Sequence, residues 1–280
     1  MAEAVEALAL GARAVAGGTD LVVGARQGKA PLPASLVAIH RLDDLRGISE
    51  AHGEVRFGSL VTHAEIVASP LVRERLTALA DASAIVGSHA TRAHGTLGGN
   101  VMNASPAMET GGPLLCFGAE AVLLSARGER RVPLAELWTG PGRTSAATDE
   151  LLVAVVLPLP APGTGSAYIR LEYRRQMEIA IAGVTAVLTP SGEAKIAITA
   201  LAPTIRRVPA AEAAFAQGVE AAARATAEAA TPISDVRASE RYRRAMTAVL
   251  ARRTLQAARA RAAGDGFPIP ASPASHGGVA

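Results

Sequence analysis

The chain has 280 residues, of which 49% are hydrophobic and 19% are charged, and its 28 basic and 25 acidic residues give a net charge of +3. This composition excludes a wholly disordered chain, and the basic excess is too small to indicate nucleic-acid binding. The single cysteine, Cys116, excludes an internal disulfide framework, and it excludes an iron–sulfur cluster or a cysteine-based zinc site held by this chain alone.

Hydrophobic periodicity predicts a mixture of helices and strands up to a Pro- and Gly-rich boundary at 161–165. The stretch Gly87–Gly112 has many glycines and few apolar residues, so we expect it to be largely loop. Helices are expected at Ala2–Leu10, Ala64–Ala68 and Leu71–Ala80, and strands at Ala12–Val15, Leu36–His40, Glu54–Gly58, Ala121–Ser125, Glu129–Val132 and Leu151–Leu157.

Beyond the boundary, three strand-like runs and two long helical runs predict a second unit. The strands are expected to form a three-stranded antiparallel sheet, because their spacing suits one and the turn signal Thr189–Gly192 interrupts the run. In the second helix, Tyr242, Ala245, Met246, Val249 and Leu250 have the spacing of one buried stripe. The Pro-, Gly- and Ser-rich end of the chain predicts a disordered tail. The strands are Tyr168–Tyr173, Ala182–Leu188 and Lys195–Leu201, the helices Ala210–Ala230 and Ala238–Ala263, and the tail Gly264–Ala280.

Two glycine loops, Ala16–Asp20 and Gly95–Asn100, are the strongest chemical signal. Adjacent glycines permit positive φ and close approach, so several backbone N–H groups can converge on one anion. Neither loop is a P-loop or a G-x-G-x-x-G fingerprint. A single Gly-Gly-Thr segment is most often only a turn. Two such loops together favour a pyrophosphate held by backbone amides without a lysine.

Five segments then form a recognisable series: AGGTDL at 16–21, GSLVTHAE at 58–65, the run at 85–100, NASPAMET at 103–110 and ISDVRASERYR at 233–243. Together they resemble the FAD-binding medium subunit of the molybdenum hydroxylases, the family of xanthine dehydrogenase and aerobic carbon monoxide dehydrogenase. The resemblance covers about residues 10 to 262. Each segment is modest alone, but all five occur in the family's order.

The resemblance implies an α+β fold in two parts. Residues 1–160 would form an FAD-binding domain of the vanillyl-alcohol-oxidase/PCMH type with two α/β subdomains. Residues 166–263 would form a smaller flavoprotein domain with a three-stranded antiparallel sheet and helices, and residues 264–280 would remain as the tail. The FAD would be bound non-covalently.

The resemblance also implies a set of cofactor-binding residues. Val15–Val22 would line the first phosphate loop and Thr96–Asn100 the second, while Val86 and Leu152 would make apolar contacts. Glu109 stands where the family usually has an aspartate that bonds a hydroxyl of FAD, and Arg170 where it usually has a lysine. The full set is Val15, Ala16, Gly17, Gly18, Thr19, Asp20, Leu21, Val22, Val86, Thr96, Leu97, Gly98, Gly99, Asn100, Glu109, Leu152 and Arg170.

Three departures from the family pattern affect single contacts. Glu109 is one methylene longer than aspartate, so its hydroxyl contact would be displaced. Arg170 replaces a point charge by a planar fork. The chain also begins at the first helix, whereas the family usually has a strand before it.

Other chemistry-bearing residues have simpler interpretations. His89 and His94 stand five apart without an acidic residue at ligand spacing, which favours surface or hydrogen-bonded histidines over a metal site. Cys116 lies in an apolar run and is expected in the core. The segment Arg237–Ala263 holds eight arginines and one glutamate, which is equally consistent with a solvated face and with a subunit contact.

The resemblance thus implies the FAD subunit of a heteromeric oxidoreductase. Electrons would come from [2Fe–2S] clusters in a small partner subunit, and the molybdenum cofactor would lie in a large one. The electron acceptor stays open, and we expect no catalytic residue and no metal ligand in this chain. The alternatives are a free-standing FAD oxidoreductase of related fold and a nucleotide-binding assembly subunit. The acidic N-terminus and the absence of an 18-residue apolar run predict a cytoplasmic protein without a membrane span.

Overall fold

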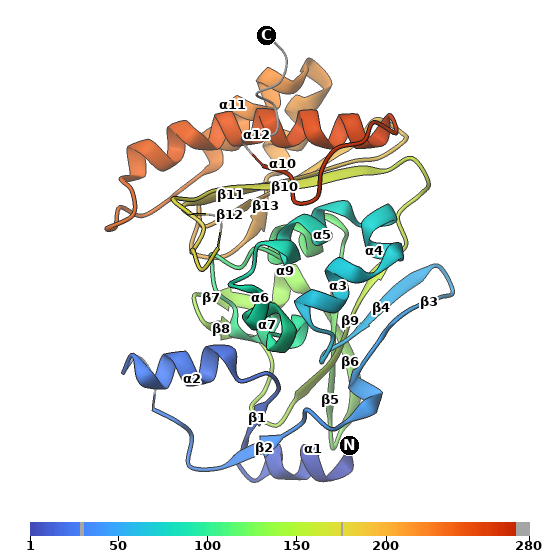
Figure 1. Cartoon of the computed structure of the whole chain (residues 1–280), viewed down its shortest axis with the longest axis vertical. Coiled ribbons are helices and arrows are strands. Elements are labelled where there is room, and N and C mark those ends of the chain that lie inside the picture. Colours follow the sequence, from blue (N-terminus) through green and yellow to red (C-terminus); the bar gives the residue numbers. More distant parts are fainter. Residues whose placement is uncertain (29–30, 175, 273–280) are drawn as a thin grey trace.

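The computed structural model describes residues 1–28, 31–174 and 176–272. It has an N-terminal part built around a five-stranded sheet and a C-terminal part built around a four-stranded sheet (Figure 1). The predicted α+β class is confirmed.

The chain begins with a small α/β subdomain. Helix α1 (Ala2–Ala9) is followed by β1 (Arg13–Val15), which pairs in parallel with β2 (Leu36–Ala38). Helix α2 (Thr19–Arg26) follows β1 at Gly18, whose φ of +70° only glycine adopts readily. The sequence showed a turn at this point but gave no sign that α2 follows.

The five-stranded sheet has the order β3-β4-β9-β5-β6, and all of its pairings are antiparallel. Its central strand reads as a continuous apolar run because it is buried along seven of its eight residues. Four short elements lie next to these strands in the chain. The 3₁₀ helix η1 (Asp43–Leu45) comes just before the first strand of the sheet, and α9 (Leu134–Leu137), β7 (Trp138–Gly140) and β8 (Arg143–Thr144) come just before the last. The strands are β3 (Ile48–Ala51), β4 (Glu54–Gly58), β5 (Glu120–Ser125), β6 (Gly128–Pro133) and β9 (Leu151–Pro158).

One helical expectation for this part was wrong. The predicted helix 71–80 is two helices, α4 (Pro70–Arg75) and α5 (Thr77–Ala84), because Leu76 leaves the helical region with φ of −130°. Upstream of them, α3 (His63–Ala68) begins with a complete capping box formed by Thr62 and Glu65.

The glycine-rich stretch 87–112 is not largely loop. It contains α6 (His89–His94), α7 (Leu97–Asn103) and α8 (Gly111–Cys116). Ser88 and Thr96 cap the first two helices by accepting N–H bonds from Thr91 and Gly99. The glycines are there for packing: a Cβ on Gly111 would lie 2.3 Å from Ile205 Cδ1. Glycine content therefore reported close contact rather than irregular chain.

The C-terminal sheet runs β10 (Gly165–Leu171), β11 (Ala182–Leu188), β12 (Ala194–Thr199) and β13 (Arg206–Arg207), all antiparallel. The three predicted strands are confirmed, and β13 adds a short fourth. The predicted helix 210–230 is interrupted, because Gly218 adopts a φ of +106° between η2 (Phe215–Gln217) and α11 (Val219–Ala229). Helix α10 (Pro209–Ala214) precedes them.

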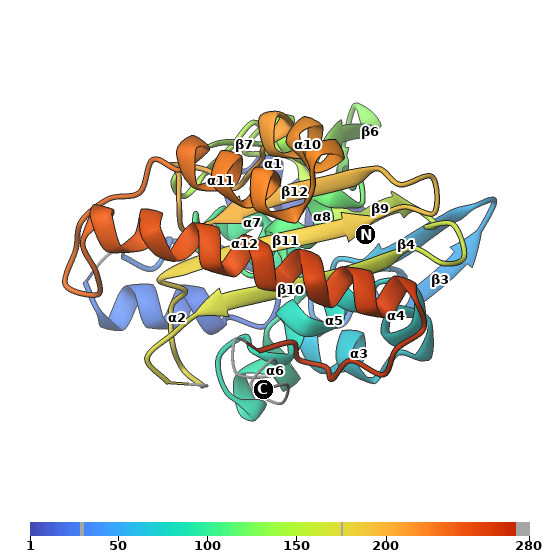
Figure 2. The same ribbon diagram turned by 90° about the horizontal axis from the view of Figure 1, so that it is seen from above.

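Helix α12 (Glu240–Ala262) lies along the outer face of this sheet (Figure 2). The stripe expected to be buried is not: Tyr242 is 47% exposed, and of the five residues only Leu250 is buried. Thr247 and Thr254 bond the carbonyls one turn back, which satisfies their hydroxyls inside the packed face. Apart from two leucines, the buried residues of α12 are small or polar: Arg243, Thr247, Leu250, Ala251, Thr254, Leu255, Ala257 and Ala258.

The described part of the predicted disordered tail, residues 264–272, packs against both parts of the molecule. Ala271 is buried, and its N–H donates to Asp81 Oδ1 at 2.9 Å. The Phe267 ring lies 5.4 Å from the Arg261 guanidinium. Disorder was the wrong expectation for this segment, because Pro and Gly content reveals nothing about contacts made across the fold. Residues 273–280 lie outside the described residues.

Candidate functional site

A cavity of about 850 Å³ lies where the N-terminal subdomain, the helices α6 and α7 and the β10–β11 connection meet. This volume is within the usual range for small-molecule and cofactor sites. Both halves of the chain contribute to its lining, and both predicted glycine loops reach it. In Figure 1, α2 and one end of the C-terminal strands lie on the same side of the molecule.

The first glycine loop offers free backbone donors. It follows β1 and turns at Gly18 into the first turn of α2, where no side chain caps the helix. The N–H groups of a first helical turn have no intrahelical partner, and they carry the positive end of the helix dipole. All of Val15–Val22 line the cavity. This loop can therefore hold an anionic group.

The second glycine loop is organised differently. The N–H groups of Leu97 and Gly98 donate to the carbonyls of Val61 and Ser59 at 2.8 and 3.0 Å, and the Gly99 N–H donates to Thr96 Oγ1. These amides are therefore already used within the protein. Thr96, Gly99 and Asn100 line the cavity, but Leu97 and Gly98 do not.

The glycines at 17 and 98 are needed for packing. A Cβ on Gly17 would lie 1.8 Å from the His94 carbonyl oxygen, and one on Gly98 would lie 2.6 Å from Ser59. Gly17 thus lets the first loop rest on the end of α6, and this contact brings the two loops to one end of the cavity. Both glycines therefore have a packing role within the protein, and the approach of a phosphate to the backbone at these positions stays a prediction.

Glu109 and Arg170 form a buried ion pair at the cavity wall. Glu109 lines the cavity, whereas Arg170 lies behind it with a side chain only 1% exposed. The Arg170 Nη1 donates to Glu109, and its Nε donates to Glu172. Burial raises the pKa of Glu109, and the Arg170 charge opposes that rise. The family's basic position is thus filled by a residue outside the cavity lining.

His63 is a buried histidine in the lining that sequence analysis passed over. It is 1% exposed, and burial together with the Arg92 charge lowers its pKa to about 4. It is therefore neutral near pH 7. Asp20 lines the same cavity, and burial raises the pKa of its carboxyl group.

The structure places most of the predicted residues in one cavity. Thirteen of the seventeen line it, and Leu97, Gly98, Leu152 and Arg170 do not. Leu152 is 4% exposed and belongs to the core of the N-terminal part. The lining also includes residues that were not predicted, among them His63, Ser105, Met108, Met177, Glu178 and Ile179. The sequence held one signal for two of them, because Met177 and Ile179 are apolar residues between two predicted strands. Both are exposed in the structure.

These residues fit a dinucleotide. The loop at Gly17–Thr19 supplies amides that have no hydrogen-bond partner in the described part of the chain and can bind a pyrophosphate, and Glu109 supplies an acceptor for a hydroxyl. Val86, Met177 and Ile179 supply apolar surface for a ring. Within the described ranges, no group of three His, Cys, Asp or Glu side chains could hold a metal ion. Cys116 is fully buried, as expected, and burial raises the pKa of its thiol.

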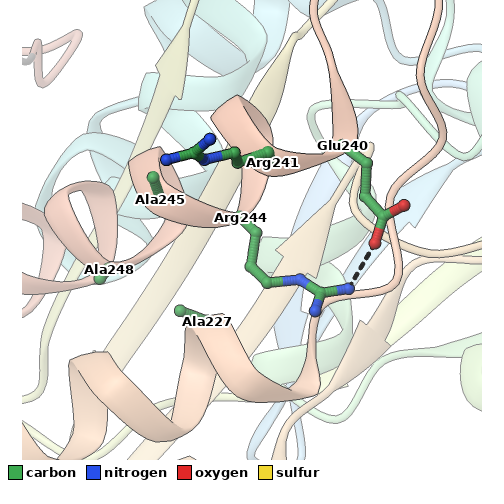
Figure 3. A pocket seen from close by; sticks show the side chains of 6 residues that line it. All are labelled: Ala227, Glu240, Arg241, Arg244, Ala245 and Ala248. Carbon is green, nitrogen blue, oxygen red and sulfur yellow. Dashed lines mark hydrogen bonds and ion pairs between the residues drawn. The ribbon is translucent and has the colours of Figure 1, made fainter.

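A second hollow lies on the outer face of the C-terminal part, between α11 and α12 (Figure 3). Its floor consists of Ala227, Ala245 and Ala248, and Arg244 donates to Glu240 at its rim at 2.7 Å. It has none of the glycine-loop donors of the first cavity. Among the described helices, none is long and apolar enough to cross a membrane.

The fold and the cavity fit an FAD-binding flavoprotein, and the comparisons with known proteins agree. The FAD binding domain in molybdopterin dehydrogenase matches residues 1–160, and the CO dehydrogenase flavoprotein C-terminal domain matches residues 167–258. The chain belongs to this molybdopterin dehydrogenase flavoprotein family. Its cofactor is FAD, and the resemblance seen in the sequence is confirmed.

Individual relatives cover nearly the whole chain. The carbon monoxide dehydrogenase medium chain of Hydrogenophaga pseudoflava is 33% identical over 82% of this chain and 84% of its own length. A putative xanthine dehydrogenase FAD-binding subunit of Escherichia coli is 31% identical over 90% of both chains. The solved carbon monoxide dehydrogenase of H. pseudoflava superposes with a TM-score of 0.88, covering 93% of this chain and 94% of that one.

Proposed function

We propose that this chain is the electron-transfer subunit of a heteromeric molybdenum hydroxylase. It would accept electrons from the [2Fe–2S] clusters of a small partner subunit, after substrate oxidation at a molybdenum centre in a large one, and pass them to an external acceptor. The observation that carries the proposal is the shared cavity. It is closed by two domains that both match flavoprotein subunits of such complexes.

The residues of the chain divide the work of binding. The amides of Gly18, Thr19 and Asp20 would hold the pyrophosphate, with the dipole of α2 adding to their attraction. Glu109 would accept a hydrogen bond from a hydroxyl group of FAD, and Val86 and Met177 would pack on the FAD rings. FAD supplies the two-electron chemistry when bound, and the protein's share is to position it and set its surroundings. A nucleophile–base pair is not required from this chain.

The test compares the chain alone with the chain co-expressed with cluster-bearing and molybdenum-bearing partners. The isolated chain should release one FAD on acid precipitation and reduce dyes slowly at most. Turnover of aldehydes, heterocycles or carbon monoxide should appear only in the three-subunit preparation. Robust turnover by the lone chain would instead establish a free-standing oxidoreductase, and a chain that binds no FAD would overturn the proposal altogether.

A further inference from the structure

Arg170 occupies an unusual position relative to the cavity. It stands on β10, in the C-terminal sheet, yet its guanidinium bonds residues that line the cavity from both halves of the chain. The Nη1 group donates to the carboxylate of Glu109, and also to the carbonyl oxygen of Glu178 at 3.3 Å. Glu109 belongs to the N-terminal domain, and Glu178 belongs to the connection that carries Met177 and Ile179.

Arg170 is also shielded from any ligand in the cavity. Its side chain is 1% exposed and is absent from the cavity lining, whereas the Glu109 side chain keeps 10% of its surface exposed. Its Nη2 is buried without a hydrogen-bond partner among the described residues. Burying a guanidinium with one unpaired donor costs free energy of folding, so the bonds made by its other donors must offset that cost.

We infer that Arg170 is a positioning residue, which aims the Glu109 carboxylate at the bound cofactor and fixes the Met177–Ile179 segment beside it. This inference rests on the proposed binding of FAD in this cavity. It separates the role of Arg170 from that of a direct cofactor ligand. The planar fork suits the task because one guanidinium can bond Glu109, Glu172 and a backbone carbonyl together.

The inference has a consequence for pH dependence that packing alone would not produce. Without the Arg170 charge, the buried Glu109 would take up a proton at higher pH, because burial already raises its pKa. A protonated Glu109 is a weaker acceptor for a cofactor hydroxyl, since charged hydrogen bonds are the stronger ones. FAD would then bind more tightly as the pH rises. The charged and titratable groups around Glu109 and in the cavity lining are Tyr168, Arg170, Glu172, Glu178, Arg13, Asp20, His63 and His94.

The experiment measures the FAD dissociation constant of the full chain between pH 6 and pH 9 by flavin fluorescence. Wild type should give a nearly constant value. Arg170→Met should bind about tenfold more weakly at pH 6, and the loss should shrink toward pH 9. The double variant Arg170→Met/Glu109→Gln should lose the pH dependence.

Conservative variants keep the test open if Arg170→Met does not fold. Arg170→Lys retains the charge, so its affinity should be independent of pH but about threefold weaker, because an ammonium cannot make all three bonds. Its loss and that of Glu109→Gln should be non-additive. Arg261→Lys is the matched control, because Arg261 also forms a buried pair between the two parts but lies outside the cavity lining.

Two outcomes overturn the inference. One is an Arg170→Met or Arg170→Lys chain whose dissociation constant stays within twofold of wild type at every pH. The other is a pH dependence that persists unchanged in the double variant. Failure of the wild-type chain to bind FAD would be a different result, because it would overturn the proposed function itself.

Discussion

Two buried arginine–carboxylate pairs join the halves of this molecule, and they differ in what their carboxylates still have to offer. Asp81 on α5 is fully buried and accepts four bonds: two from Arg261, one from the Tyr168 N–H and one from the Ala271 N–H. Glu109 accepts from Arg170 and still faces the cavity. The first carboxylate is saturated by protein donors, whereas the second retains capacity for a ligand.

The two ion pairs show how a structural pair can be distinguished from a functional one when both cross a domain boundary. Asp81 gathers α5, β10, α12 and the segment after α12 at one point, so its bonds fix how the C-terminal part sits on the N-terminal part. We expect Glu109 and Arg170 to add less such closure, because two of the three bonds of Arg170 lead to cavity-lining residues. We expect the first pair to govern stability and the second to govern affinity.

The largest expected effect is on the Asp81 pair. Asp81→Ala leaves the Arg261 charge buried, together with two backbone N–H groups that have lost their acceptor. Breaking a buried pair in this way is expected to lower the free energy of unfolding by about 3–5 kcal/mol. Urea unfolding monitored by circular dichroism measures the loss.

The same variant also tests the comparison. The fraction of Asp81→Ala that remains folded should bind FAD with nearly the wild-type dissociation constant, since Asp81 is outside the cavity lining. A tenfold weaker affinity at unchanged stability would reverse the roles assigned to the two pairs.

Most of the strands were predictable because they have a local signal, whereas the short strands β3, β7, β8 and β13 were not predicted. The central strand β9 is a continuous apolar run, and a turn with Pro190 and Gly192 separates β11 from β12. The face of α12 was not predictable in this way. Its apolar stripe at Tyr242 lies outward, while threonines that bond their own helix lie inward. Hydrophobic periodicity assumes that polar residues seek water, and that assumption fails where the helix itself satisfies them.

The candidate site was predictable where the backbone does the work and less so where tertiary packing decides. The loop Val15–Val22 lines the cavity because its sequence sets the turn into α2. Leu97 and Gly98 stand in an equally glycine-rich segment, but their N–H groups donate to carbonyls of the segment between β4 and α3. The sequence does not reveal that this segment lies beside them. Met177 and Ile179 were missed because they reach the cavity from the other domain.

His63 is a buried titratable group without an opposite charge beside it among the described residues, unlike Asp81 and Glu109. His63 has a folded pKa of about 4, below its unfolded value of roughly 6.5, so the unfolded chain binds more protons between these pH values. Stability must therefore fall as the pH falls through this window. Between pH 7 and pH 5, FAD-free wild type should lose about 2 kcal/mol more than His63→Gln. Equal losses in urea titrations of the two proteins would show that His63 is not held neutral.

The packing role of Gly17 predicts a loss of affinity from one methyl group. Gly17→Ala sets a Cβ against the His94 carbonyl, so the two loops must separate at the end of the cavity. FAD should bind at least about tenfold more weakly, equivalent to about 1.4 kcal/mol. Gly24→Ala is the matched control, because Gly24 lies on α2 with no atom within 4 Å of the added Cβ. Similar dissociation constants for both variants would remove the loop-on-loop contact from the account.

The smallest expected effect is at an exposed pair of the same chemistry. Glu240 and Arg244 stand four residues apart on α12 and form a 2.7 Å ion pair at the rim of the outer hollow (Figure 3). Their side chains are about half exposed, at 52% and 47%, so water and salt compete with the bond. Arg244 also stands near the start of its helix, where the dipole disfavours a positive charge.

Arg244→Gln should therefore change the free energy of unfolding by about 0.5 kcal/mol or less, and 1 M salt should erase most of that difference. Urea unfolding at low and high salt measures both values. A loss of several kcal/mol, or one that salt leaves unchanged, would mean that α12 is held by its charged outer face as well as by its packed inner one. Burial would then no longer be the property that separates the Asp81 and Glu109 pairs from the other arginine–carboxylate contacts of this chain.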